Sequence, residues 1–100
     1  MTIWKNCTCD IYYAADTATL NDPGYEVRID GDELVLSYES ETGWVNYRGR
    51  DAGNGHYIIS APEVEGRGVL HRTPGAEILE GCWEENGWRG MWRVYPSGSR

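Results

Sequence analysis

The chain has 100 residues, which is the length of one domain and enough to bury a core without disulfides or metals. Five Trp and seven Tyr supply its aromatic mass in the absence of Phe, and the net charge of −7 argues against a surface that binds nucleic acid. The sequence shows no N-terminal signal segment and no apolar run near the ~20 residues of a membrane span. We therefore expect a cytosolic protein with reduced thiols, no cofactor and no membrane partner.

The charge is placed unevenly along the chain. Residues 1–41 hold nine acids and two bases, hence −7, and residues 42–100 hold seven of each, hence zero. Eight of the nine bases are Arg, which suits pairing with carboxylates on a sheet surface.

The N-terminal half is expected to begin with a strand. Alternation with a period of two predicts this strand over residues 3–13, with Cys7 and Cys9 on its apolar face, and a short helix is the alternative. Residues 14–24 are expected to form a long loop or one helical turn, which the turn residues Asp22-Pro-Gly24 close. The pattern over residues 25–95 predicts a meander of short strands separated by turns that contain Gly, Asn or Asp. A polar tail is expected over residues 96–100.

The C-terminal part contains the strongest hairpin signal. Asn86-Gly87 suits a type I′ turn, because both central residues of that turn need a positive φ. This turn predicts a ladder that runs from the pair Glu85–Trp88 to the pair Leu79–Val94. A loop over residues 74–77 pairs Thr73 with Ile78. One inner row then holds Gly68, Trp83 and Gly90, and the next holds Leu70, Gly81 and Trp92.

These elements predict an all-β protein with a single β domain over residues 1–100. About eight short strands in an antiparallel up-and-down meander are expected to form a small barrel or a strongly curved sandwich. Glycines in successive strands favour the sharp coiling that a small barrel requires.

Two Gly-x-Trp pairs, Gly81-Cys-Trp83 and Gly90-Met-Trp92, fall within about the last twenty residues. They resemble the motif of the small ligand-binding barrels of the lipocalin and avidin type. In lipocalins this motif opens the first strand, whereas here both copies lie near the C-terminal end. The resemblance is therefore one of barrel shape, and shape alone does not assign a function.

Two groups of side chains suggest chemistry. Cys7 and Cys9 form a C-x-C pair that is a candidate metal site, although buried thiols are the commoner interpretation of such a pair. Glu80 is expected beside His71 and Arg93 on the outer face, where the three would suit acid–base catalysis or form a row of surface ion pairs.

Other side chains are candidates for binding. Trp83, Trp92, Leu70 and Val94 are expected inside the barrel, where they line a ligand cavity or fill the core. Exposed Trp and Arg are enriched at protein interfaces. The candidate interface residues are Trp44, Trp88 and Arg89.

The leading functional expectation is a non-enzymatic binding module that recognises a protein partner or a second copy of itself. The alternative is a carrier for a small apolar ligand with a Trp-lined interior, and a third possibility is a hydrolase that uses Glu80 and His71. A solvent-filled interior beside Trp83 and Trp92 would favour the carrier, and an exposed apolar patch over a dry core would favour the interaction module. A cleft that contains Glu80 would favour the enzyme.

Overall fold

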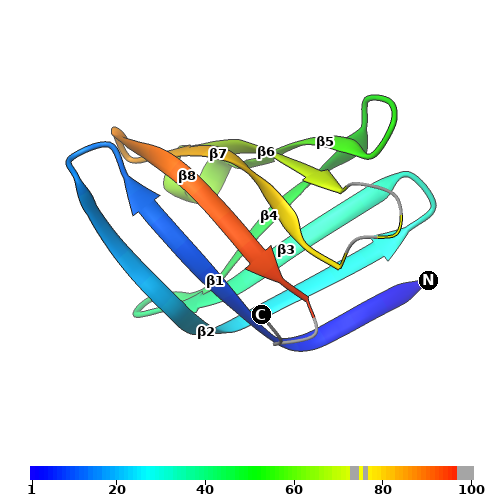
Figure 1. The fold of residues 1–100 in the computed structure, drawn as a ribbon, viewed down its shortest axis with the longest axis horizontal. Coiled ribbons are helices and arrows are strands. Elements are labelled where there is room, and N and C mark those ends of the chain that lie inside the picture. Colours follow the sequence, from blue (N-terminus) through cyan, green and yellow to red (C-terminus); the bar gives the residue numbers. More distant parts are fainter. Residues whose placement is uncertain (73–74, 76, 97–100) are drawn as a thin grey trace.

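The computed structural model describes residues 1–72, 75 and 77–96, and it shows eight antiparallel strands in a closed barrel (Figure 1). Each strand pairs with the next one along the chain, and β8 returns to pair with β1. The prediction of an all-β meander is confirmed, and the closed strand order identifies a barrel instead of a sandwich. The elements are β1 (Thr2–Tyr13), β2 (Thr17–Asp30), β3 (Glu33–Ser40), β4 (Gly43–Asp51), β5 (His56–Ala61), η1 (Pro62–Val64), β6 (Gly66–Arg72), β7 (Leu79–Glu85) and β8 (Trp88–Tyr95).

The predicted register of the β7–β8 hairpin is confirmed. The pairs run from Leu79–Val94 to Glu85–Trp88, and the turn residues Asn86 and Gly87 have φ values of 51° and 84°. The β6–β7 pairing also follows the prediction, because Trp83 lies opposite Gly68. The expected pairing of Thr73 with Ile78 lies outside the described residues.

The prediction of a loop over residues 14–24 is wrong. A short turn follows Tyr13, and β2 begins at Thr17. The Asp22-Pro-Gly24 segment lies inside β2, where the ladder to β1 shifts its register and Gly24 has a φ of 88°. The residues that favour turns are the same residues that bulges need, since both require unusual backbone angles.

The prediction of a strand over residues 3–13 is confirmed, but its alternation breaks at Asn6. This residue has a φ of 61°, and the register to β2 shifts between Trp4 and Cys7. Trp4 consequently packs against the core, whereas Ile3 is 47% exposed. Cys7 and Cys9 both lie in the core after the bulge.

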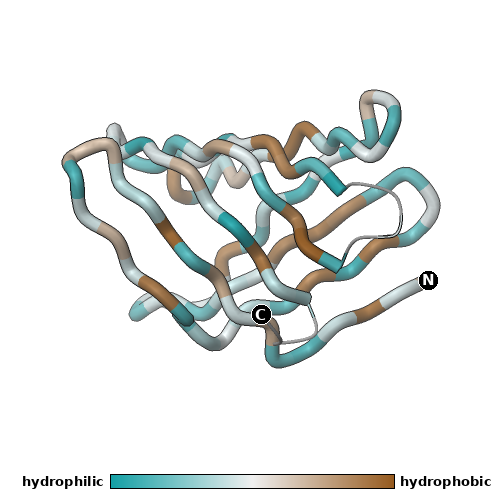
Figure 2. Tube along the Cα trace, viewed as in Figure 1, coloured by the Kyte–Doolittle hydropathy of each residue, from teal (hydrophilic) through white to brown (hydrophobic). Residues whose placement is uncertain are grey.

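Apolar and polar residues alternate along much of the strands (Figure 2). The buried apolar residues gather in one core cluster, so one face of each strand lines the barrel interior. Fully buried side chains reach the end of the barrel opposite the β7–β8 turn, where Leu34 follows the β2–β3 turn and Leu79 begins β7. No helix in the described part of the chain has the length and apolar character needed to cross a membrane. Fully buried core side chains include Val27, Leu34, Leu36, Leu70, Leu79 and Val94.

Candidate ligand-binding site

The β1–β2, β3–β4 and β7–β8 turns lie at one end of the barrel, on the left in Figure 1. A cavity of about 300 Å³ lies between the inward side chains there, and we call it the mouth cavity. This volume is at the lower limit of small-molecule pockets, which span roughly 300–1,000 Å³. The lining residues are Ile11, Tyr13, Asp22, Tyr25, Tyr38, Glu39, Tyr47, Trp83, Glu85, Trp88 and Trp92.

Two indole rings form the inner part of the mouth cavity. The Trp83 Nε1–H donates to the carbonyl oxygen of Met91 at 3.1 Å, and the Trp92 Nε1–H donates to that of Val69 at 3.1 Å. Trp83 of β7 therefore extends toward β8, where Gly90 lies opposite it. Trp92 of β8 extends past Gly81 of β7 and reaches β6, two strands away. Only 8% of Trp83 and 5% of Trp92 is exposed, so both rings are held by packing and by a hydrogen bond.

Further rings complete an aromatic lining. Tyr13 meets Trp83 edge to face with a centroid distance of 5.5 Å, and Tyr47 meets Trp92 in the same way at 5.2 Å. Tyr38 lies 5.6 Å from the Tyr25 ring. Edge-to-face contacts at these distances fix the ring planes relative to one another.

Carboxylates organise the phenolic hydroxyls of this lining. Glu85 Oε1 accepts hydrogen bonds from Tyr38 at 2.7 Å and from Tyr47 at 2.6 Å. Tyr25 donates to Asp22 Oδ2 at 3.0 Å. Burial raises the pKa of all three tyrosines, and the hydrogen bonds to the carboxylates raise the pKa further. The hydroxyls consequently remain protonated donors at neutral pH.

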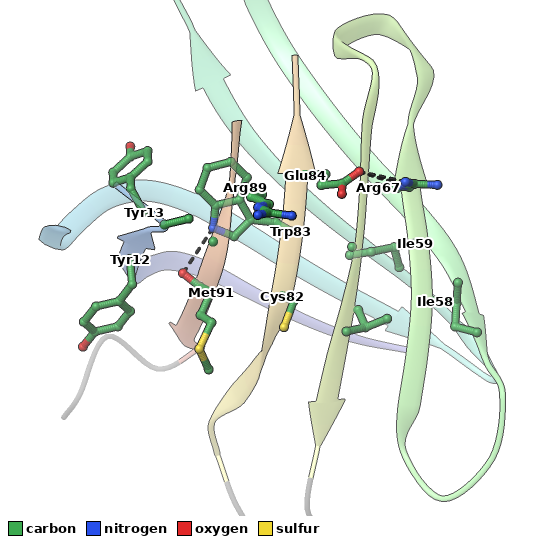
Figure 3. Close-up of a pocket in the computed structure, with 14 residues that line it drawn as sticks. Tyr12, Tyr13, Ile58, Ile59, Arg67, Cys82, Trp83, Glu84, Arg89 and Met91 are labelled. Carbon is green, nitrogen blue, oxygen red and sulfur yellow. Dashed lines mark hydrogen bonds and ion pairs between the residues drawn. The ribbon is translucent and has the colours of Figure 1, made fainter. Parts of the chain in front are cut away.

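A second hollow lies on the outside of the barrel and measures about 600 Å³; we call it the outer groove. The strand pairings align apolar side chains across five neighbouring strands, and Met91 and Ile58 are each 58% exposed. In Figure 3 this band lies beside a second, charged band, in which Arg67 pairs with Glu84 at 2.8 Å. The apolar band is Tyr12, Met91, Cys82, Val69 and Ile58, and the charged band is Arg89, Glu84 and Arg67.

The structure brings the candidate catalytic residues together on the outer face. His71 is paired with Glu80 across the β6–β7 ladder, and Arg93 is paired with Glu80 across the β7–β8 ladder. Arg93 Nε donates to Glu80 Oε2 at 3.0 Å, with 45% and 55% of their side chains exposed. Glu80 lines neither the mouth cavity nor the outer groove. The arrangement is a solvent-exposed ion pair beside a histidine.

The candidate metal ligands are protonated thiols within the core. The single S–H donor of Cys7 has two carbonyl acceptors within reach of Sγ, that of Trp4 at 3.3 Å and that of Pro96 at 3.1 Å. Burial raises the pKa of Cys7, and burial with the nearby Asp22 charge raises that of Cys9 to about 12. Within residues 1–72, 75 and 77–96, no three His, Cys, Asp or Glu side chains are grouped to hold a metal ion.

The binding candidates divide among several places. Trp83 and Trp92 meet in the mouth cavity, whereas Leu70 and Val94 lie in the closed core and do not line it. Among the interface candidates, Trp88 lies at the rim of the mouth cavity and is 61% exposed, and Arg89 lines the outer groove. Trp44 is on β4, at a separate depression on the outside of β2–β4.

Sequence reasoning missed the tyrosines and Glu85 as site residues. The available signal was Glu85 itself, which follows Trp83 by two positions in the predicted ladder and therefore faces the interior. An inward carboxylate at the end of a strand needs hydrogen-bond donors, and tyrosine hydroxyls supply them here. The sequence did not identify Tyr38 and Tyr47 as these donors, because their strands meet Glu85 only when the barrel is closed.

No protein-family model, curated protein sequence or solved structure gives a significant match to this chain. The mouth cavity and the outer groove are therefore the two features on which a function can be based.

Proposed function

We propose that this protein is a non-enzymatic small-molecule-binding barrel and that the mouth cavity is its binding site. The observation that supports this most directly is the open space of about 300 Å³ beside Trp83 and Trp92, inside a barrel whose other half is filled by its own side chains. Aromatic walls with a few placed polar groups are typical of pockets that bind small molecules. A cavity of this volume admits only a small ligand.

The five Trp residues provide a direct test, because each indole N–H gives a separate NMR signal. Trp88 and Trp92 line the mouth cavity alone, Trp83 lines both the mouth cavity and the outer groove, and Trp4 and Trp44 line neither. In a titration with a library of small cationic, neutral and anionic compounds, we expect binders to shift the first three signals and to leave the other two unchanged.

A variant that fills the cavity serves as the negative control for this titration. Ile11 lines the mouth cavity, and Ile11→Trp places a larger side chain into it. Ile58→Trp is the matched variant on the outer groove. Binding must disappear in Ile11→Trp and persist in Ile58→Trp. A library without a single binder, or shifts that survive Ile11→Trp, would rule out the mouth cavity as the site.

A second candidate function is recognition of a protein partner at the outer groove. Its support is the apolar band across five strands, in which Met91 and Ile58 are well exposed. The neighbouring charged band has two guanidinium groups, Arg67 and Arg89, and one carboxylate, Glu84. A partner segment with apolar side chains flanked by carboxylates complements this surface.

Peptide display against the immobilised protein tests this second function. Selected peptides should combine apolar and acidic residues and bind Met91→Glu at least about tenfold more weakly, a loss of about 1.4 kcal/mol. Trp44→Glu is the matched control, because Trp44 is an exposed aromatic residue outside the groove. Equal binding by the Met91→Glu variant would contradict the proposal. A dimer in sedimentation that Met91→Glu disperses would assign the surface to a second copy instead.

A further inference from the structure

We propose that the mouth cavity is selective for a small organic cation, with an ammonium group held between the aromatic rings and the carboxylates of Glu85 and Asp22. This inference rests on the proposed binding function and names its ligand class. Neither the composition of the chain nor its strand pattern predicts it, because the contributing residues come from different strands.

The charge of the lining supports a positive ligand. Three of the lining side chains are carboxylates, those of Asp22, Glu39 and Glu85, and none is Lys, Arg or His. The low-dielectric aromatic surroundings strengthen the field of these carboxylates relative to bulk water. A cation entering the cavity is therefore attracted, and an anion is repelled.

The hydrogen bonds of the lining point to the same class of ligand. The hydroxyls of Tyr25, Tyr38 and Tyr47 already donate to the carboxylates of Asp22 and Glu85. The indole N–H groups of Trp83 and Trp92 donate to backbone carbonyls. The polar atoms that these groups leave for a ligand are acceptors, which suits a charged donor or a quaternary ammonium group. The remaining side-chain donors of the lining belong to Tyr13 and Trp88.

Glu85 is placed for this role by its own hydrogen bonds. Both phenolic donors bind its Oε1 atom, and within the described residues no hydrogen bond to Oε2 is made. The carboxylate is therefore oriented by two tyrosines while one of its oxygens remains available to a ligand.

The rings supply the second half of the recognition. An ammonium group is attracted to the face of Trp or Tyr within about 6 Å of the ring centroid, and cages of such rings bind quaternary ammonium ions. The rings of Tyr13, Tyr25, Tyr38, Trp83 and Trp92 all line the mouth cavity. A metal ion does not fit this lining, because the described residues provide no group of three or more metal ligands.

The test compares choline with its neutral carbon analogue, in which a carbon atom replaces the ammonium nitrogen. The two molecules have nearly the same shape, so a difference in affinity measures the charge. Isothermal titration calorimetry at low ionic strength should show choline binding at least about tenfold more tightly. Equal affinities, or binding of neither compound, would overturn the cation inference. The binding function itself stands or falls with the library titration, in which a neutral or anionic binder of the mouth cavity would keep the function and exclude the cation.

Two Glu→Gln variants distinguish a local effect of the cavity carboxylate from an effect of the overall negative charge of the protein. Glu85→Gln should weaken choline binding about tenfold more than it weakens binding of the neutral analogue. Glu84→Gln is the matched control, because the adjacent Glu84 points to the outer face and pairs with Arg67. Equal weakening by both variants would contradict a local role for Glu85. If Glu85→Gln fails to fold, Asp22→Asn provides the same comparison, with weakened choline binding expected and unchanged binding contradicting the proposal.

Discussion

At the scale of single residues, Trp83 and Glu84 show how neighbouring positions differ in their contribution. Trp83 packs against Tyr13 and hydrogen-bonds to Met91, so Trp83→Ala removes a large buried ring and leaves a carbonyl without its donor. We expect a loss of about 3–5 kcal/mol in the free energy of unfolding, measured by urea denaturation. Glu84→Ala removes an ion pair whose side chains are 76% and 46% exposed, and should cost less than about 1 kcal/mol. Similar losses would mean that the two faces are wrongly assigned.

The buried tyrosines predict a stability that falls at high pH. Burial, with help from the Glu85 carboxylate, raises the pKa of Tyr38 and Tyr47 above the ordinary value near 10. The folded protein thus keeps protons that the unfolded chain releases. The stabilisation is complete below about pH 10 and is lost as the pH rises further. Above about pH 10 the free energy of unfolding therefore falls with pH, and Tyr47→Phe should make this fall less steep by up to about 1.4 kcal/mol per pH unit. The raised pKa of Tyr38 and Tyr47 would be disproved if absorbance showed all tyrosines ionised just above pH 10 while the circular dichroism spectrum remained that of the folded protein.

At the scale of strands, glycines allow neighbouring backbones to approach closely. A Cβ atom at Gly90 would collide with the carbonyl oxygen of Tyr12, on the strand that closes the barrel. Similar approaches recur in two other strand pairs, which shows that tight coiling is distributed around the barrel. The other two are Gly49 against Ile58 and Gly81 against Val69.

Two alanine substitutions separate close approach from turn geometry. At Gly87 a Cβ meets nothing within 4 Å, but the φ of 84° disfavours alanine, so Gly87→Ala should cost about 1–2 kcal/mol. Gly90→Ala should cost more, about 3 kcal/mol, because a backbone carbonyl must move and the β8–β1 pairing with it. Denaturant midpoints measure both. A smaller loss at Gly90 than at Gly87 would show that the barrel closure tolerates an added side chain.

The hairpin was predictable and the β1–β2 pair was not, for a physical reason. Asn86-Gly87 lies between two clear alternations, so the turn type and the register agree. Asn6 and Asn21 also take positive φ values, but inside strands, where they introduce bulges that local patterns do not distinguish from turns. Ring positions at the mouth were beyond prediction, because Glu85 and Tyr47 meet only after the barrel closes.

At the scale of the whole molecule, the meander converts a charge bias in the sequence into a bias in space. Residues 1–41, with nine acids and two bases, form the adjacent strands β1, β2 and β3, and residues 42–100, with seven of each, contribute the rest of the barrel. One side of the barrel is therefore acidic, and the mouth cavity adds Glu85 from β7 to Asp22 and Glu39 of this side. The mutual repulsion of these carboxylates opposes folding, whereas their negative field favours the binding of a cationic ligand.

Salt should therefore act on folding and on binding in opposite directions. Raising NaCl from 0.01 M to 1 M shortens the Debye length from about 30 Å to about 3 Å. If salt screens about 1 kcal/mol of repulsion among the acidic side chains, the melting temperature of a domain of this size should rise by about 4–8 °C. The affinity for choline should fall, because the attraction of the carboxylates for the cation is screened as well. Differential scanning calorimetry and isothermal titration calorimetry measure the two effects on the same samples. Glu85→Gln should keep the rise in melting temperature and lose part of the salt dependence of binding, because one of the three carboxylates that attract the ligand is then neutral. A melting temperature that falls with salt would show that attractive ion pairs, such as Arg67–Glu84, outweigh the repulsion among the acids of β1–β3.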